Sequence, residues 1–295
     1  MPSAEPTRLT DDLWLAAHDS VNGKPWIGDW PLGVGLATGL LAELVHDGWL
    51  ELRQGELFRT TTEPPGDPAL RPLLIKMETE EQNWSPIPQP PAPPVRASAR
   101  PEAYGGRVWD TQAQAPVWPV TAHEDQGWPA SASDDREWSP AVYGGHVRHL
   151  VPGREESRHR QRGHQLGAWM SYLAYERRAE DRVLDRLSRA GLVRRRERRR
   201  LLGGTTVSYV PCDSVTSGTA TSGISIAVRS RRGLDKSQLF LAGLFLATGL
   251  HHHALVTLSS SERSDLADEL KRGLGEMPRE LLRAADAAIG EAAMR

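Results

Sequence analysis

Apolar residues recur at helical spacing in two stretches of the chain, and a glycine ends each stretch. In residues 31–47 leucines repeat every three or four positions, and Gly48 follows. In residues 166–190 a second apolar face ends at Gly191. After each glycine the sequence predicts a β-hairpin, the first turning at Gln54-Gly55 and the second within the arginine run or at Gly203-Gly204. The two halves of the chain therefore share one order: apolar helix, glycine, hairpin.

Further helical patterns surround these two. Thr10, followed by two aspartates, predicts an N-terminal helix that begins there. The stretch around 236–250 is apolar on every side, so we place it at the centre of the core. Three more helical patterns lie at 67–84, 261–277 and 278–294. The sequence therefore predicts a mainly α fold, with a central helical bundle, surrounding amphipathic helices and one or two β-hairpins.

Residues 85–163 interrupt this pattern. Proline recurs every few residues and aliphatic periodicity is absent, so the segment cannot bury enough apolar area to offset the entropy of ordering it. We predict a disordered Pro/Trp-rich insertion that separates 7–84 from 164–295, the two parts of one helical domain. The phrases NWSP and EWSP, like YGGRV and YGGHV, recur in this region. They are either low-complexity drift or short aromatic docking motifs.

Composition excludes several classes of protein. Cys212 is the single cysteine, which leaves no disulfide framework and no cysteine-based zinc site. No run approaches the roughly 18 apolar residues of a membrane span, and the N-terminus lacks the pattern of a secretory signal. Only 39% of residues are hydrophobic. We expect a soluble protein of the cytoplasm.

Catalytic chemistry is not indicated. The chain has no G-x-S-x-G motif, and Cys212 has no neighbouring histidine to activate it. The glycines of residues 33–39 resemble a dinucleotide fingerprint, but no strand precedes them, so we interpret Gly35 and Gly39 as sites of close helix packing. Residues 251–253 are consecutive histidines, which point in different directions on a regular element, and we do not expect them to bind a metal. We predict no enzyme activity, no cofactor and no metal.

Charge is distributed unevenly along the chain. Residues 154–200 carry fifteen Arg and seven Asp or Glu, whereas residues 1–78 carry six basic and twelve acidic side chains. On a strand, alternate residues share a face, so an arginine-rich hairpin has no apolar face and projects towards solvent or an anionic surface. The hairpin residues that we expect to contact a membrane are Arg194, Arg195, Arg196, Arg198, Arg199, Arg200, Leu201 and Leu202.

Two anionic partners fit this arrangement. One is the headgroup layer of a bilayer, because two leucines directly follow the arginines. The other is nucleic acid, because a helix, a glycine and an arginine-rich hairpin also build a winged-helix module. The net charge of −2 and the absence of a polar base-reading helix disfavour nucleic acid.

The sequence also resembles a known family. LTDDLWLAAHDSVNGKPW and PLGVGLATGLLAELVHDGWLEL resemble the opening of the Golgi phosphoprotein 3 family, and RVLDRLSRAGLVRRRERRRLLG resembles its helix and hairpin. DKSQLFLAGLFLATGL resembles its C-terminal part. The resemblance implies a compact helical fold, no enzymatic activity, and peripheral membrane binding through phosphatidylinositol 4-phosphate by an adaptor that grips the tails of other proteins.

The resemblance also implies a headgroup site. The candidate headgroup-binding residues that it implies lie ahead of the second helix and on the helix before the hairpin: Trp26, Trp30, Arg177, Arg178 and Arg182. Arg177 matches the first of an arginine pair in the family, whereas Glu180 stands at the second position. Ala37 stands where the family has a further arginine, and Gly28 falls on the tryptophan position in an ungapped alignment.

The expected function is thus a peripheral membrane protein at the inner face of a membrane. Its main partner is anionic phospholipid, and the segment 85–163 offers a surface for protein partners. The hairpin is also a candidate surface for homo-oligomerisation. The alternative function is a winged-helix-like nucleic-acid-binding protein.

Overall fold

The computed structural model describes residues 8–84, 162–199 and 205–294. The predicted insertion at 85–163 lies outside the described residues, except for its last two positions. The described part is mainly helical with two small antiparallel sheets, which confirms the predicted fold class. The elements before the insertion are α1 (Leu9–Ala17), α2 (Asp29–His46), β1 (Leu50–Arg53), β2 (Glu56–Arg59) and α3 (Arg71–Gln82).

After the insertion the chain forms a second set of elements. These are β3 (His164–Gln165), α5 (Leu166–Ala174), the 3₁₀ turn η1 (Tyr175–Arg177), α6 (Arg178–Arg189), β4 (Val193–Arg199), β5 (Thr205–Pro211), α7 (Ser214–Arg229), α8 (Lys236–Ala247), α9 (His251–Ala254), α10 (Ser260–Gly273) and α11 (Glu276–Ala293). β3 pairs with β2, so one strand from after the insertion completes the first hairpin as a three-stranded sheet.

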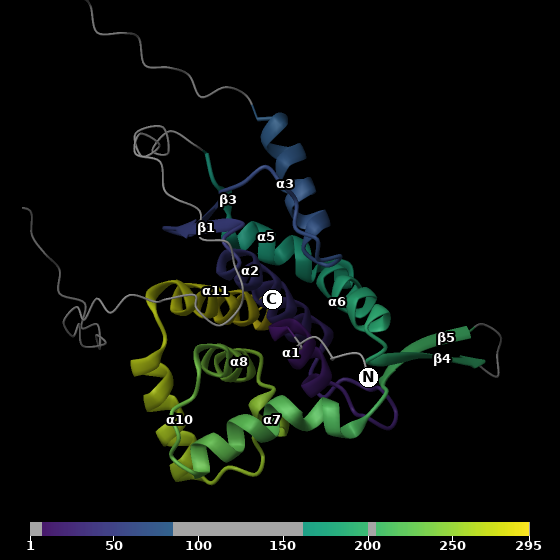
Figure 1. Cartoon of the computed structure of the whole chain (residues 1–295), viewed down its shortest axis with the longest axis vertical. Helices are drawn as coiled ribbons and strands as arrows, with labels where there is room; N and C mark the ends of the chain where they lie inside the picture. Colours follow the sequence, from purple (N-terminus) through teal and green to yellow (C-terminus); the bar gives the residue numbers. More distant parts are fainter. Residues whose placement is uncertain (1–7, 85–161, 200–204, 295) are drawn as a thin grey trace, which may run out of the picture. The chain divides into compact units, whose positions relative to one another are not determined.

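The helix at the centre of the fold is α2. Its residues from Leu32 to Leu44 are buried without interruption, and it packs against α1, α5, α6, α11 and β1 (Figure 1). We had expected the apolar stretch that forms α8 to hold this place. α8 is also buried along most of its length, and it packs against α1, α2, α7, α10 and α11. The sequence pattern did not distinguish these two apolar helices.

Glycines allow close approach to α2, as predicted. A Cβ on Gly35 would lie 2.6 Å from Thr248 Cγ2, and a Cβ on Gly39 would meet Thr10 Cγ2 at a still shorter distance. Close packing at these two positions therefore requires glycine, because a Cβ would clash with the neighbouring threonine. The glycines that were predicted to end the two apolar helices are also found there. Gly48 after α2 and Gly191 after α6 both have positive φ, 75° and 70°.

Several helix boundaries differ from the predicted ones. α1 begins at Leu9, so Thr10 lies inside its first turn and binds Glu43 instead of capping. α10 is capped by Ser259, which forms a capping box with Glu262. Sequence analysis missed α7 entirely, because its many Ser, Thr and Gly residues are weak helix formers.

Candidate functional site

β4 and β5 form a ribbon of seven facing residue pairs that projects from the helical body (Figure 1). Its base is anchored, because Val193 and Val210 are buried and Cys212 N donates a hydrogen bond of 2.8 Å to Leu192 O. The turn at 200–204 lies outside the described residues, as do the side chains of Arg198 and Arg199. The predictions for Arg200, Leu201 and Leu202 therefore have no structural counterpart.

The described arginines of this ribbon are exposed. Arg194, Arg195 and Arg196 all present their side chains to solvent. Arg195 pairs with Glu197 of its own strand at 2.8 Å, and Arg196 Nη1 donates to Val21 O at 3.1 Å. No acidic helix covers this part of the ribbon in the described structure. The positive charge that the sequence predicts for this strand therefore lies on the protein surface.

A sharp kink separates α5 from α6. Glu176 and Arg177 adopt left-handed backbone conformations, with φ of 52° and 58°, which cost on the order of 1 kcal/mol or more each in residues other than glycine. The kink directs two neighbouring arginines to different clusters. Arg177 contacts Glu180, whereas Arg178 contacts Tyr172, Tyr175 and Glu176.

Glu180 gathers three partners in a buried position. It is 3% exposed and accepts two hydrogen bonds of 2.6 Å from Arg177 and one of 3.3 Å from Trp14 Nε1. His18 Nε2 lies 3.7 Å away. Hydrogen bonding to Glu180 raises the pKa of Arg177, and burial lowers the pKa of His18. Arg177 therefore already has a strong internal counter-ion.

Trp30 and Arg178 share a pocket of about 380 Å³ between α2, α5 and α11. Its aromatic wall includes Tyr172 and Tyr175, and the Arg178 guanidinium lies 4.5 Å and 5.3 Å from these two ring centroids. Trp30 is held by a hydrogen bond of 3.2 Å from Nε1 to Ala288 O. The pocket thus combines one cation and three aromatic rings with the carboxylate of Glu291, and the cation is already paired with Glu176 at 2.8 Å.

Trp26 lies elsewhere. Its ring is stacked on His253 with centroids 5.2 Å apart, and both line a groove of about 430 Å³ between the α1–α2 loop and α7. Arg182 joins neither cavity, and its half-buried side chain leaves Nε without a hydrogen-bond partner in the described structure. The five residues assigned to headgroup binding therefore occupy separate places, and only Trp30 and Arg178 lie in one concavity.

Comparison with known proteins decides the family. The family model described as Golgi phosphoprotein 3 (GPP34) matches residues 9–87 and 146–291, which is most of the chain. The chain belongs to this family. The match omits 88–145, a range that falls within the predicted insertion. No curated protein matches the chain. Proteins of the Golgi phosphoprotein 3 family are of a non-enzymatic, adaptor type, and none of the helices described here is long and apolar enough to cross a bilayer.

This member of the Golgi phosphoprotein 3 family departs from the arginine pair that the resemblance implies. Arg177 and Glu180 occupy the two positions, and they bind each other. Ala37, at the position of the further arginine, is fully buried in α2. A phosphate that approached Arg177 would compete with a carboxylate that is already hydrogen-bonded. At the position where the resemblance implies a headgroup site, Arg177 is therefore neutralised by Glu180 of the same chain.

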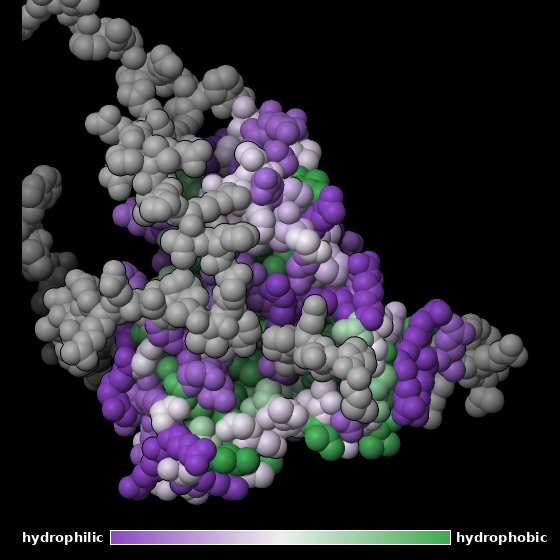
Figure 2. Space-filling model, in the orientation of Figure 1, coloured by the Kyte–Doolittle hydropathy of each residue, from purple (hydrophilic) through white to green (hydrophobic). Residues whose placement is uncertain are grey.

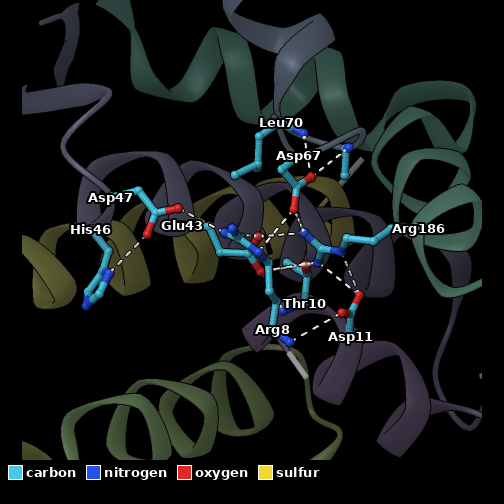
Figure 3. A network of polar contacts seen from close by, with 10 residues as sticks. Arg8, Thr10, Asp11, Glu43, His46, Asp47, Asp67, Leu70 and Arg186 are labelled. Carbon is cyan, nitrogen blue, oxygen red and sulfur yellow. Dashed lines mark hydrogen bonds and ion pairs between the residues drawn. The ribbon is translucent and has the colours of Figure 1, made fainter. Parts of the chain in front are cut away.

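Sequence analysis also missed a buried polar network around Arg186 (Figure 3). This guanidinium lies 2.9 Å from Asp11, 2.9 Å from Glu43 and 3.2 Å from Asp67. Arg8, which is partly exposed, pairs with Asp67 at 3.0 Å. The network joins α1, α2, α6 and the loop before α3. The signal in the sequence was the single glutamate within the apolar run LLAELV.

Burial and neighbouring charges act in opposite directions on the pKa values of Arg186 and Asp11. Burial opposes the charge on Arg186, but Glu43 and Asp11 outweigh it and raise its pKa. Burial, with help from Glu43, raises the pKa of Asp11 despite the nearby guanidinium. Arg186 is bound within this network and Arg189 pairs with Asp185 at 2.7 Å, so these two arginines of α6 have acidic partners. Among the described arginines of residues 154–200, the exposed ones are Arg162, Arg177, Arg189, Arg194, Arg195 and Arg196, and the last three lie together on β4.

The three consecutive histidines form α9. His253 stacks on Trp26, and His251 Nδ1 lies 3.3 Å from Phe245 O. The residues described here contain no group of three His, Cys, Asp or Glu side chains arranged to hold a metal ion. Cys212 is exposed at the foot of β5.

Proposed function

We propose that this chain is a peripheral membrane protein of adaptor type that binds anionic phospholipid headgroups at the inner, cytoplasmic face of a membrane. The observation that supports this most is the projecting β4–β5 ribbon with exposed Arg194, Arg195 and Arg196. Membership of the Golgi phosphoprotein 3 family favours an adaptor over an enzyme. Phosphatidylinositol 4-phosphate is the proposed lipid, by the family resemblance.

The ribbon supplies attraction that depends on charge and not on one headgroup. Each arginine close to an anionic leaflet contributes about 1 kcal/mol, and the contribution falls off within a Debye length of about 8 Å at physiological salt. Three described arginines therefore give reversible binding that weakens as salt is raised. Glu197 offsets part of this attraction through its pair with Arg195.

Selectivity for a phosphomonoester needs several converging donors. The pocket of Trp30 and Arg178 supplies one guanidinium beside aromatic rings, and Arg177 supplies a second cation on the other side of the kink if Glu180 releases it. We propose that phosphatidylinositol 4-phosphate binding at this place is weaker than electrostatic binding by the ribbon.

The test is co-sedimentation of the full chain with vesicles at 0.15 M salt. The vesicles contain phosphatidylcholine alone, phosphatidylcholine with phosphatidylserine, or phosphatidylcholine with phosphatidylinositol 4-phosphate. We expect binding to both anionic compositions, loss of binding at high salt, and no binding to phosphatidylcholine. Equal binding to neutral and anionic vesicles, or none to any, would contradict the proposal.

The nucleic-acid alternative has a specific structural basis, because α6, Gly191 and the β4–β5 ribbon follow one another as helix and wing do in winged-helix proteins. A gel-shift experiment with random duplex DNA at physiological salt separates the two functions. Retardation of the duplex together with absence of vesicle binding would replace the membrane proposal by the nucleic-acid one.

A further inference from the structure

Exposed apolar side chains gather beside the arginine ribbon. A soluble surface scatters such residues singly, and a group of them marks an interaction site. Four of the large hydrophobic side chains that are exposed in the described structure lie here: Val21 (74% exposed), Val215 (73%), Val256 (64%) and Trp26 (45%). Figure 2 shows this hydrophobic surface below the hydrophilic ribbon and along α7.

Contacts fix these residues next to the arginines. Arg196 Nη1 donates to Val21 O at 3.1 Å, which joins β4 to the α1–α2 loop. Gly23 of that loop has a φ of 69° and lies directly against Tyr209 O of β5, where no Cβ would fit. Val21, Trp26 and Val256 line the same groove as the first turns of α7. One continuous surface therefore runs from the ribbon across the loop to α7.

The composition of α7 is unusual for a surface helix. From Ser214 to Val228 it carries no charged residue, although Val215, Thr219, Ser222 and Ile226 are exposed on one face at helical spacing. Thr219 Oγ1 donates to Val215 O at 2.8 Å, so this hydroxyl is satisfied within the helix. The two apolar side chains and the Thr219 hydroxyl of this face therefore lose little when water is removed.

We propose that this apolar surface enters the interfacial region of the same anionic bilayer that the ribbon contacts. We call it the valine surface and define it as Val21, Trp26, Val215 and Val256. The inference rests on the proposed function and adds a hydrophobic anchor to it. The occupant is argued from charge, since Arg194, Arg195 and Arg196 border the surface and attract anionic headgroups to that side.

The carboxylates around the valine surface are already engaged. Asp19 accepts hydrogen bonds from Val21 N and Asn22 N, Asp213 caps α7 by accepting from Val215 N and Thr216 N, and Glu197 pairs with Arg195. Each lies at the border of the surface with its charge partly satisfied, which limits repulsion of an anionic leaflet.

A label at Cys212 tests the inference on the full chain. Cys212 is the single cysteine, is exposed, and lies between β5 and α7, next to Val215. We expect an environment-sensitive fluorophore at Cys212 to shift to the blue with phosphatidylcholine–phosphatidylserine vesicles, and to be quenched by brominated acyl chains. The matched control is Cys212→Ser with Ile75→Cys on α3, which lies far from the ribbon (Figure 1) and should show neither effect.

Substitutions separate this inference from the proposed function. V21D/V215D should weaken vesicle binding at least tenfold and abolish the shift at Cys212, whereas I75D should leave both unchanged; all three side chains are exposed, so folding is preserved. If V21D/V215D binds vesicles like the natural chain while R194E/R195E/R196E does not, the anchor is wrong and the proposed function stands. If V21D/V215D instead converts a dimer to a monomer with vesicle binding unchanged, the surface joins two copies and the inference is overturned.

Discussion

Arg177, at the kink, and Glu180, in the first turn of α6, are joined by two hydrogen bonds of 2.6 Å. The carboxylate end of this pair is buried, and the guanidinium end is 54% exposed. A carboxylate in this bidentate geometry accepts hydrogen bonds from the same N–H donors that a phosphate would use. We therefore expect Glu180 to limit anion binding at a position where the family resemblance implies a second cation.

Removing the charge of Glu180 should release Arg177. We expect Glu180→Gln to bind phosphatidylinositol 4-phosphate vesicles several-fold more tightly than the natural chain. Stability should fall by about 1–3 kcal/mol, because Glu180 also accepts a hydrogen bond from Trp14. Parallel co-sedimentation and urea unfolding measure both effects. Asp185→Asn is the control, since Asp185 lies on the same helix and pairs with the exposed Arg189; equal affinity for all three chains would show that Glu180 does not limit binding.

Stability should decrease as the pH falls below about 6.5. Burial lowers the pKa of His18 in the folded state, so the unfolded chain takes up the proton first and is favoured on acidification. One such group changes the free energy of unfolding by at most about 1.4 kcal/mol per pH unit. Urea unfolding at pH 7.5 and 5.5 measures this change.

The variant His18→Gln isolates the contribution of this histidine. Its stability should change less between pH 7.5 and 5.5 than that of the natural chain. Asp11 acts in the opposite direction at lower pH, because its raised pKa favours the protonated form of the folded state. An unchanged pH dependence in the variant would show that His18 is not a source of it.

The Arg186 network predicts a large loss of stability. Arg186→Met leaves Asp11, Glu43 and Asp67 close together with little compensation, and removal of one partner from a buried ion pair costs about 3–5 kcal/mol. Arg189→Met, which removes an exposed pair with Asp185, should change stability by less than about 1 kcal/mol. Comparable losses in the two variants would contradict a structural role for the network.

Close packing at Gly35 can be measured against a matched glycine. Gly35→Ala places a Cβ 2.6 Å from Thr248 Cγ2 and 3.3 Å from Leu13 Cδ2, and overpacking of this kind costs about 1–3 kcal/mol. Gly167 on α5 has open space around it, so Gly167→Ala should stabilise by about 0.5–1 kcal/mol. The midpoint temperature of thermal unfolding should therefore fall for Gly35→Ala and rise for Gly167→Ala. A rise for both variants would show that a Cβ at position 35 of α2 fits without overpacking.

The part of the fold that local pattern controls was predictable. The two helix–glycine–hairpin units, with Gly48 and Gly191 at positive φ, follow from apolar spacing and from the conformational freedom of glycine. α7 was not predictable in this way, because its Ser, Thr and Gly residues are held helical by packing of Ile224 and Val228 against the core. Tertiary contacts thus override a weak local preference.

The site was predicted less completely than the fold. The exposure of Arg194–Arg196 followed from the lack of an apolar face, which is a local property of a strand. The kink at Glu176 and Arg177 was hidden, since both are ordinary polar residues that adopt left-handed conformations only in this context. The Arg186 network joins residues more than a hundred positions apart, and charge counting along the sequence could not separate these neutralised arginines from those of the ribbon.

The affinity for anionic vesicles of two triple variants tests the central claim most directly. R194E/R195E/R196E reverses the exposed charges of the ribbon, and R231E/R232E/R272E makes the same change in net charge on exposed arginines near α8 and α10. With about 1 kcal/mol for each arginine near the leaflet, the first variant should lose at least a hundredfold in binding to phosphatidylcholine–phosphatidylserine vesicles, while the second keeps most of its affinity. Equal affinities for the two variants would show that the ribbon is not the surface that faces the membrane.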